Sequence, residues 1–224
     1  MPDVRVAIST IDDGSMYLRR EPESQPIQDN RSRWFASHGF STKDATRVFV
    51  TFDDTEDFCR YSIVGDNEKG QGMADDDVVH ADALVTTTPG HVLFLPVADC
   101  IATTIFDEEH GVLMLTHLGR HSLEQDGGVR SVEFLAKQFG SRPEALRVWT
   151  TPSINREVYP IFKLNNVGMK DAFFEQMNRA GVPRASIIDN DADTEVDPRY
   201  YSYSEFLKGH KPEGSHAMLA VMPV

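Results

Sequence analysis

The sequence has 224 residues, of which 40% are hydrophobic and 25% charged, so it suits a single globular domain with a sizeable core. Its formal net charge is −13, and a surface of this sign repels nucleic acid backbones and anionic membranes, so we expect neither as a partner. No apolar run approaches the ~18 residues of a spanning helix, the N-terminus lacks a signal-peptide pattern, and the two cysteines form no C-x-x-C pair, so we expect a cytoplasmic protein.

Hydrophobic periodicity predicts more strands than helices. In chain order, we expect a strand at 4–10, a helix at 28–39, a strand at 47–52, an exposed acidic excursion at 53–79, four strands at 81–87, 91–98, 101–106 and 111–117, a helix at 128–140, a strand at 146–151, a helix at 167–181, and strands at 185–189 and 216–222. Each of the helices ends at a glycine. This order favours an α+β fold with a large mixed or antiparallel β-sheet core flanked by helices, in one domain over residues 1–224.

Two of these strands form a predicted hairpin. They flank the short polar turn DEEHG, and pairing Phe106 with Val112 would place Cys100 opposite residue 118, one step from His117. A one-residue bulge would make Cys100 and His117 direct neighbours, with Cβ atoms ~4.5–5.5 Å apart. That distance suits a thiolate and an imidazole on one zinc ion, and it also suits a Cys–His nucleophile and base. The alternative is a cysteine that serves only as a small buried hydrophobic residue.

Four motifs carry a resemblance to a known family. They follow one another as ADALVTTTPG at 81–90, PVADC at 96–100, THLGRHS at 116–122 and TTPSI at 150–154, with supporting matches in DNRSRWFASHG, DAFFEQMNRAGV and YYSY. In this order they resemble the laccase-domain family, whose members are described as polyphenol oxidases and as zinc-dependent purine nucleoside phosphorylases, some with adenosine deaminase activity. The resemblance covers nearly the whole chain and implies a zinc site and a purine nucleoside substrate.

The resemblance also implies the metal ligands. The family holds zinc with a histidine, the cysteine of its ADC motif and a second histidine, and the last two correspond to Cys100 and His117. Aligning VFVTFDDTEDF with the strand before the first histidine places Asp54 there, and a carboxylate can replace imidazole on zinc. His80 is the competing third ligand. We expect copper less than zinc, because the eight histidines include no H-x-H pair.

The basic residues of the family motifs are partly missing. The arginine of the family's S-T-R motif is Ile11 here, and Glu205 lies in the stretch where the family carries two late arginines. Because phosphate is usually held by arginine forks or helix N-termini, these changes put phosphorolysis in doubt. Arg120 and His121 are the basic groups nearest to His117 in the chain, and we expect them to hold any phosphate. Asp99 is expected either to orient a ligand or act as a base, or to serve as a hydrogen-bonding residue at the strand end.

The prediction is therefore a zinc-dependent purine nucleoside phosphorylase or adenosine deaminase-like enzyme, monomeric or homodimeric. Its catalytic residues would be Cys100, His117, Asp99, Arg120 and His121, and phosphate would be the co-substrate of phosphorolysis. Two alternatives come from other classes. One is a metal-free Cys–His hydrolase or amidase, and the other is a catalytically silent family member that only binds a nucleoside.

Overall fold

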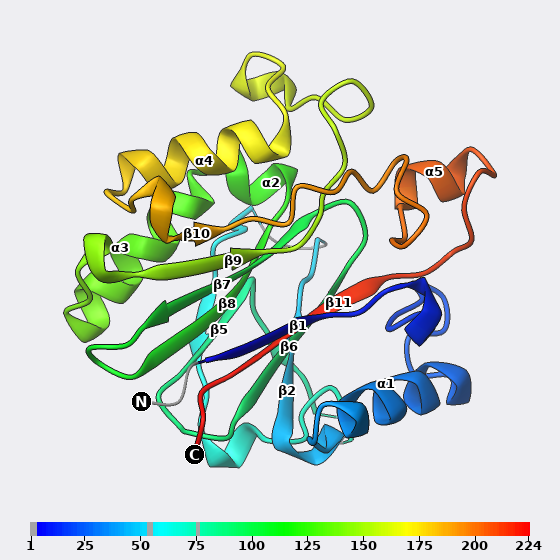
Figure 1. Cartoon of the computed structure of the whole chain (residues 1–224), viewed down its shortest axis with the longest axis horizontal. Coiled ribbons are helices and arrows are strands. Elements are labelled where there is room, and N and C mark those ends of the chain that lie inside the picture. The colour runs from blue at the N-terminus through cyan, green and yellow to red at the C-terminus, as the bar shows by residue number, and fades with distance from the viewer. Residues whose placement is uncertain (1–3, 53–55, 75–76) are drawn as a thin grey trace.

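The computed structural model describes residues 4–52, 56–74 and 77–224, and its strands form two mixed sheets (Figure 1). The five-stranded sheet has the order β1 (Arg5–Ile8), β11 (His216–Val221), β6 (Val92–Val97), β2 (Ala45–Phe49) and β4 (Val79–His80). The six-stranded sheet has the order β10 (Ile187–Ile188), β9 (Arg147–Thr150), β7 (Ile101–Asp107), β8 (Val112–Leu118), β5 (Ala83–Thr86) and β3 (Tyr61–Ile63). The α+β class is confirmed, but the core contains two sheets rather than one.

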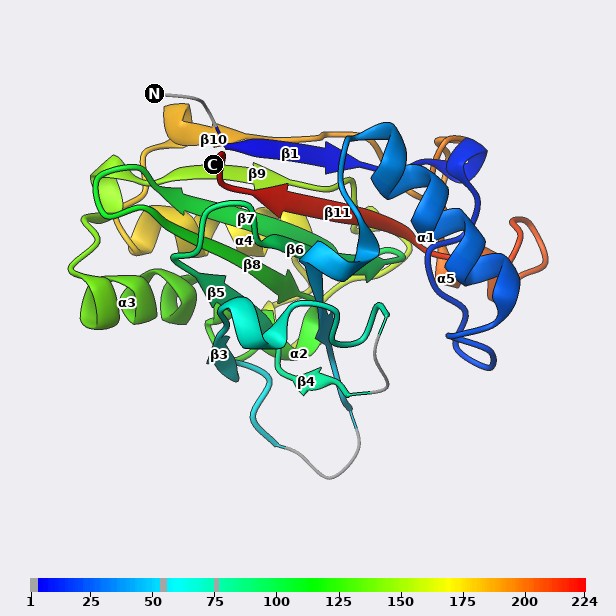
Figure 2. The ribbon, with the colours of Figure 1, turned by 90° about the horizontal axis from the view of Figure 1, so that it is seen from below.

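Helices cover the outer faces of these sheets. The α-helices of the described residues are α1 (Gln25–Ser37), α2 (Arg120–Leu123), α3 (Gly127–Phe139), α4 (Met169–Arg179) and α5 (Tyr203–Leu207). Figure 2 shows α1 on one side of the stacked strands and α3 on the other. The short helices α2 and α5 were not expected from the sequence. Within the described part of the chain, no helix combines the length and the apolar character that crossing a membrane requires.

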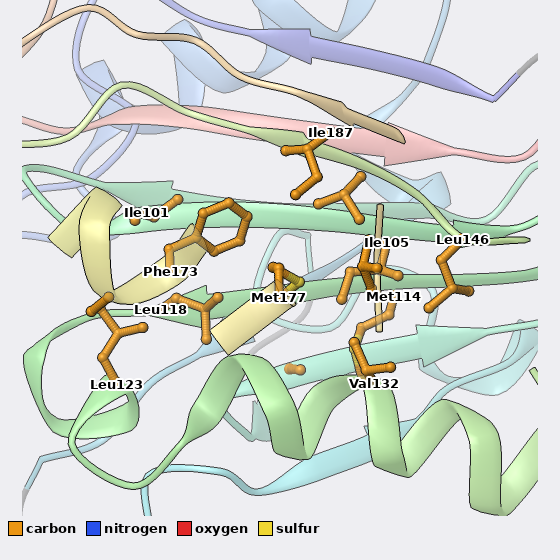
Figure 3. Close-up of a cluster of buried hydrophobic side chains, with 14 of the residues drawn as sticks. Ile101, Ile105, Met114, Leu118, Leu123, Val132, Leu146, Phe173, Met177 and Ile187 are labelled. Atoms are coloured by element: carbon orange, nitrogen blue, oxygen red, sulfur yellow. The ribbon is translucent and has the colours of Figure 1, made fainter. Parts of the chain in front are cut away.

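Both faces of the central strands are buried, which explains their long apolar runs. Side chains alternate along a strand, so Leu93 and Leu95 of β6 face the other sheet whereas Phe94 packs against Phe35 of α1, with ring centroids 5.3 Å apart. On the far side of the six-stranded sheet, Ile105 and its neighbours pack against α3 and α4 (Figure 3). The protein therefore has three hydrophobic layers, one between the sheets and one beneath each group of helices.

One expectation about the middle of the chain is wrong. Residues 53–79 are not a wholly exposed excursion, because β3 joins a sheet within it and Cys59, Val64 and Met73 are buried. The four consecutive central strands are divided between the sheets, since β6 belongs to the five-stranded sheet and β7 to the six-stranded sheet. The chain crosses between them at Asp99, whose φ of 79° is tolerated better by Asp than by most residues. This crossing places Cys100 where the two sheets meet.

A buried histidine gives the fold a predictable acid sensitivity. His216 on β11 is fully buried, its ring packs edge-on against Tyr200 at 5.3 Å, and neither ring nitrogen has a hydrogen-bond partner among the described residues. Burial, helped by the nearby charge of Lys211, lowers the pKa of His216 to about 3. An unfolded histidine takes up a proton below about 6.5, so the free energy of unfolding should fall as pH drops from 6.5 towards 3.

We expect His216→Leu to flatten this pH dependence. The difference in urea midpoint between pH 7 and pH 5 should shrink by the equivalent of about 2 kcal/mol. At pH 7 the substitution removes no hydrogen bond, so we expect no loss of stability from that cause. Replacing the exposed His80 by asparagine is the control and should leave the pH dependence as it was. If His216→Leu and the wild type showed the same pH dependence, protonation of His216 would not be the cause of the acid sensitivity.

Candidate functional site

The hairpin of β7 and β8 brings Cys100 and His117 to the same face. Its register pairs Phe106 with Leu113 and Ala102 with His117, one residue away from the pairing expected from the sequence. Extending this register places Cys100 opposite Gly119, which is two residues from His117. Because side chains alternate along a strand, residues 117 and 119 share a face, so Cys100 and His117 are diagonal neighbours and no bulge is needed.

Gly119 leaves the space in which the two side chains meet. A Cβ atom on residue 119 would lie 2.9 Å from Cys100 Sγ, 2.9 Å from His117 Cε1 and 3.3 Å from His117 Nε2. The thiol and the imidazole therefore converge on one point above a backbone without a side chain. A sulfur and a nitrogen donor on a shared point form a donor set that suits zinc.

Burial sets the protonation states of this pair. It lowers the pKa of His117 to about 4, so the imidazole is unprotonated at neutral pH and has a lone pair for a metal or a proton. Burial, followed by the charge of Asp99, raises the pKa of the Cys100 thiol to about 12, although Arg19 and Arg120 act in the opposite direction. In the absence of a metal the thiol thus stays protonated, which disfavours a cysteine nucleophile. A coordinated metal would deprotonate it.

Residues around the pair fix the position of His117. Ser122 Oγ accepts a hydrogen bond from the Gly119 N–H at 3.0 Å and lies 3.1 Å from the His117 carbonyl, to which it can donate. The His117 N–H donates to the Asp82 carbonyl at 2.8 Å. The Ser122 contacts explain the serine after the GRH turn in structural terms.

Arg60 connects this region to the segment that contains Asp54. Its guanidinium binds both carboxylate oxygens of Asp82 at 2.7 and 3.1 Å, and it donates to Thr51 Oγ1 at 2.8 Å. It thereby holds the chain before residue 53 against the strand that supports His117. Arg60 is not among the residues expected from the sequence; the signal that could have indicated it is the aspartate of the ADALVT motif, which needs a cationic partner once buried.

Of the two residues expected from the sequence as a third metal ligand, the structure describes His80. Asp54 lies outside the described residues, but Phe52, two residues earlier, has its ring 6.3 Å from that of His117. His80 is exposed on β4, where its ring packs against Phe49 at 5.0 Å. In the described ranges, no three His, Cys, Asp or Glu side chains come together as a metal site, so His80 does not join Cys100 and His117.

Asp99 has both carboxylate oxygens engaged in holding the crossing between the sheets. Thr194 Oγ1 donates to one oxygen at 2.8 Å, the Ser204 N–H donates to the other at 2.8 Å, and the residue is only 5% exposed. The Ile154 N–H of the TTPSI motif donates to its carbonyl at 3.1 Å. Of the two roles expected for Asp99, this arrangement favours the hydrogen-bonding one, which positions Cys100.

Arg120 and His121 contact each other at the start of α2. Arg120 Nη2 lies 2.9 Å from His121 Nε2, the Arg120 guanidinium lies over the Tyr159 ring at 5.9 Å, and His121 stacks on Phe58 at 4.6 Å. Burial and the charge of Arg120 lower the pKa of His121. Arg120 is therefore the cation of the pair at neutral pH, and His121 contributes a neutral ring.

A cavity of about 570 Å³ opens beside Cys100 and His117, a volume typical of small-molecule sites. Its charged lining residues are Arg19, Arg47 and Glu213, and its aromatic lining residues are Tyr17, Phe49, Phe52 and Tyr203. Arg19 lies 4.0 Å above the ring of Tyr203 and is close enough to Cys100 to lower the pKa of its thiol. Arg19 could not be expected from the sequence, because it lies in an irregular loop about 80 residues before Cys100.

Comparison with known proteins links the chain to relatives by sequence. The family model described as multi-copper polyphenol oxidoreductase laccase matches residues 11–175. A purine nucleoside phosphorylase of Deinococcus radiodurans is 31% identical over 150 residues, which are 63% of this chain and 50% of that protein. A purine nucleoside phosphorylase of Bacteroides thetaiotaomicron is 28% identical over 122 residues, which are 49% of this chain and 44% of that protein. The matched part thus spans about half the length of these relatives.

Solved structures share the fold over nearly the whole chain. YlmD from Geobacillus stearothermophilus has a TM-score of 0.86 at 17% identity and covers 99% of this chain and 92% of its own. The hypothetical protein YfiH of Bacillus licheniformis has a TM-score of 0.83 at 17% identity and covers 98% of this chain and 92% of its own. At these identities the likeness establishes the architecture of the two sheets and their helices.

Proposed function

Since the chain belongs to the multi-copper polyphenol oxidoreductase laccase family, we propose that it is a zinc-dependent enzyme of purine nucleosides, with phosphorolysis as its leading reaction. The observation that carries the proposal is the convergence of Cys100 and His117 over Gly119 at the edge of a cavity large enough for a nucleoside. The names of the two sequence relatives support the substrate class. We take the whole chain to form one domain of this family.

The donor atoms fit zinc better than copper in a multicopper centre. Cys100 supplies a thiolate once the metal binds, His117 supplies an unprotonated imidazole, and Asp54 is the proposed third ligand. When bound, the ion would polarise the substrate or lower the pKa of a water molecule. The chain's own contribution is to hold the imidazole in its neutral form and to keep Gly119 free of a side chain that would fill the metal position.

Two further groups have defined tasks in this proposal. Phe52 is 50% exposed beside His117, and such an exposed ring can stack against a planar purine. Arg19 provides a positive charge on the cavity side of Cys100, where the phosphate of phosphorolysis needs a partner. Arg19 thus compensates for the arginine that Ile11 replaces, and it favours phosphorolysis over deamination, which requires no anion.

The experiment is a screen of adenosine, inosine and methylthioadenosine with and without phosphate, together with elemental analysis of the purified protein. We expect release of the free base only when phosphate is present, and stoichiometric zinc. Loss of ammonia from adenosine without phosphate would show a deaminase instead. Binding of a nucleoside without turnover would favour the silent family member, and turnover by zinc-free protein would favour the Cys–His hydrolase.

A further inference from the structure

Two buried arginines share one carboxylate at the end of the cavity away from Cys100. Arg31 Nη1 lies 2.7 Å from one oxygen of Glu23, and Arg47 Nη1 lies 2.6 Å from the other. The arginine side chains are 1% and 3% exposed, whereas that of Glu23 is 45% exposed. Two guanidinium groups against one carboxylate leave one positive charge without a partner in this cluster.

Arg47 is the member of this cluster that retains hydrogen-bonding capacity. Arg31 also donates through Nε to the Met16 carbonyl at 2.9 Å and through Nη2 to the Pro22 carbonyl at 3.2 Å, so each of its three nitrogens has a partner. Arg47, in contrast, lines the cavity, and its buried Nε has no hydrogen-bond partner among the described residues. Buried charges are normally paired, so we expect an anion to bind at Arg47.

The other charges of the cavity do not supply that anion. Among the described residues, Glu213 is the carboxylate in the lining, and Arg19 provides a positive charge that offsets it. Glu23 is already shared between Arg31 and Arg47. The described part of the lining therefore has an excess of positive charge, and this excess lies with Arg47.

Arg47 is also remote from the proposed reaction centre. It lies in the middle of β2, where it pairs with Phe94 of β6, six residues before Cys100. The strand from Phe94 to Val97 alone spans roughly 10 Å towards Cys100. Tyr17 and Phe49 line the space beside Arg47, with ring centroids 5.7 and 5.1 Å from its guanidinium carbon. An anion held there is thus a substituent of the substrate rather than the group that reacts at Cys100 and His117.

We infer that Arg47 forms a binding subsite for a phosphate group carried by the substrate, so that the cavity prefers a nucleoside monophosphate to the corresponding nucleoside. The inference rests on the proposed function for the location of the base near His117. A guanidinium binds a phosphate through parallel hydrogen bonds, which suits a residue with unused donors and a surplus charge. A ligand that fills the cavity in this way would span from Arg47 to Phe52.

The test is calorimetric binding of 5′-AMP and adenosine to the wild-type protein and to Arg47→Met at constant ionic strength. We expect 5′-AMP to bind the wild type roughly ten- to a hundredfold more tightly than adenosine, and Arg47→Met to remove this preference while adenosine still binds. Equal affinities in the wild type would overturn the inference. Because binding is measured without turnover, a failed activity screen would not affect this test, and a missing preference for 5′-AMP would leave the proposed function intact.

A second variant separates anion binding from a structural role of the ion pair. Glu23→Gln breaks the same pair but keeps both guanidinium groups, so the affinity for 5′-AMP should be retained or increased. Arg47→Lys should retain part of the preference for 5′-AMP over adenosine. If Glu23→Gln lost as much affinity for 5′-AMP as Arg47→Met, the ion pair would serve only to stabilise the fold, and the inference would be overturned. The inference would also be overturned if inorganic phosphate bound together with adenosine while 5′-AMP bound no more tightly than adenosine. That result would show a subsite for free phosphate.

Discussion

Cys100→Ser should abolish stoichiometric zinc in the purified protein. A serine hydroxyl is a poor zinc ligand, and the imidazole of His117 would then have to hold the ion with a single carboxylate. The loss of affinity should exceed the 10–100-fold that removal of a merely supporting residue causes, because a ligand itself is removed. His117→Ala should have the same effect, and zinc per chain by elemental analysis is the measurement.

Cys59→Ser is the matched control for this experiment. Cys59 is the other cysteine of the sequence and is buried, with its Sγ 4.0 Å from the Ser122 carbonyl, so it differs from Cys100 in location rather than chemistry. We expect this variant to keep its zinc. Asp54→Ala should weaken zinc binding markedly; zinc that persists in Asp54→Ala but disappears in His80→Ala would identify His80 as the third ligand. Wild-type protein free of zinc would refute the metal site.

The strands that carry the site could be predicted from the sequence because they are buried on both faces. The runs at 101–106 and 111–117 have the turn and the β-rich composition of a hairpin, and β7 and β8 occupy almost the same residues. The exact register could not be predicted, since a short polar turn permits several pairings and a one-residue difference changes every partner. The convergence of Cys100 and His117 does not require the expected bulge, because Gly119 leaves space for diagonal neighbours.

Contacts between distant segments could not be predicted from local patterns. The division into two sheets depends on the change of direction at Asp99, and that residue is held by Thr194 and Ser204, about a hundred positions later. The cations of the cavity could not be predicted either, since only the tertiary fold brings Arg19 and Arg47 to the cavity lining. Arg120 and His121 could be predicted because they follow His117 closely in the chain; they contact each other, and Arg120 is near enough to Cys100 to lower the pKa of its thiol.

The second large effect is expected for Arg19. A phosphate anion that enters this cavity must approach a protein with a formal net charge of −13, so it needs a cation close to Cys100. Arg19 lines the cavity, is oriented by the ring of Tyr203 at 4.0 Å, and is near enough to Cys100 to lower the pKa of its thiol. A charge-assisted hydrogen bond contributes about 1.5–3 kcal/mol, which corresponds to roughly a ten- to hundredfold change in rate.

Arg19→Met should therefore reduce kcat/KM for phosphorolysis by roughly ten- to a hundredfold, while any deamination of adenosine, which uses no anion, should survive. The rates of both reactions are measured in Arg19→Met, Arg120→Met and the control Arg20→Met, which changes the exposed neighbour of Arg19 in the chain. Arg20→Met should retain the wild-type rates, and Arg19→Lys should recover part of the loss because it restores the charge. A parallel fall of both reactions in Arg19→Met would show that the stack on Tyr203 supports the cavity rather than the anion. Phosphorolysis that persists in Arg19→Met but is lost in Arg120→Met would place the anion at Arg120, as the sequence predicts.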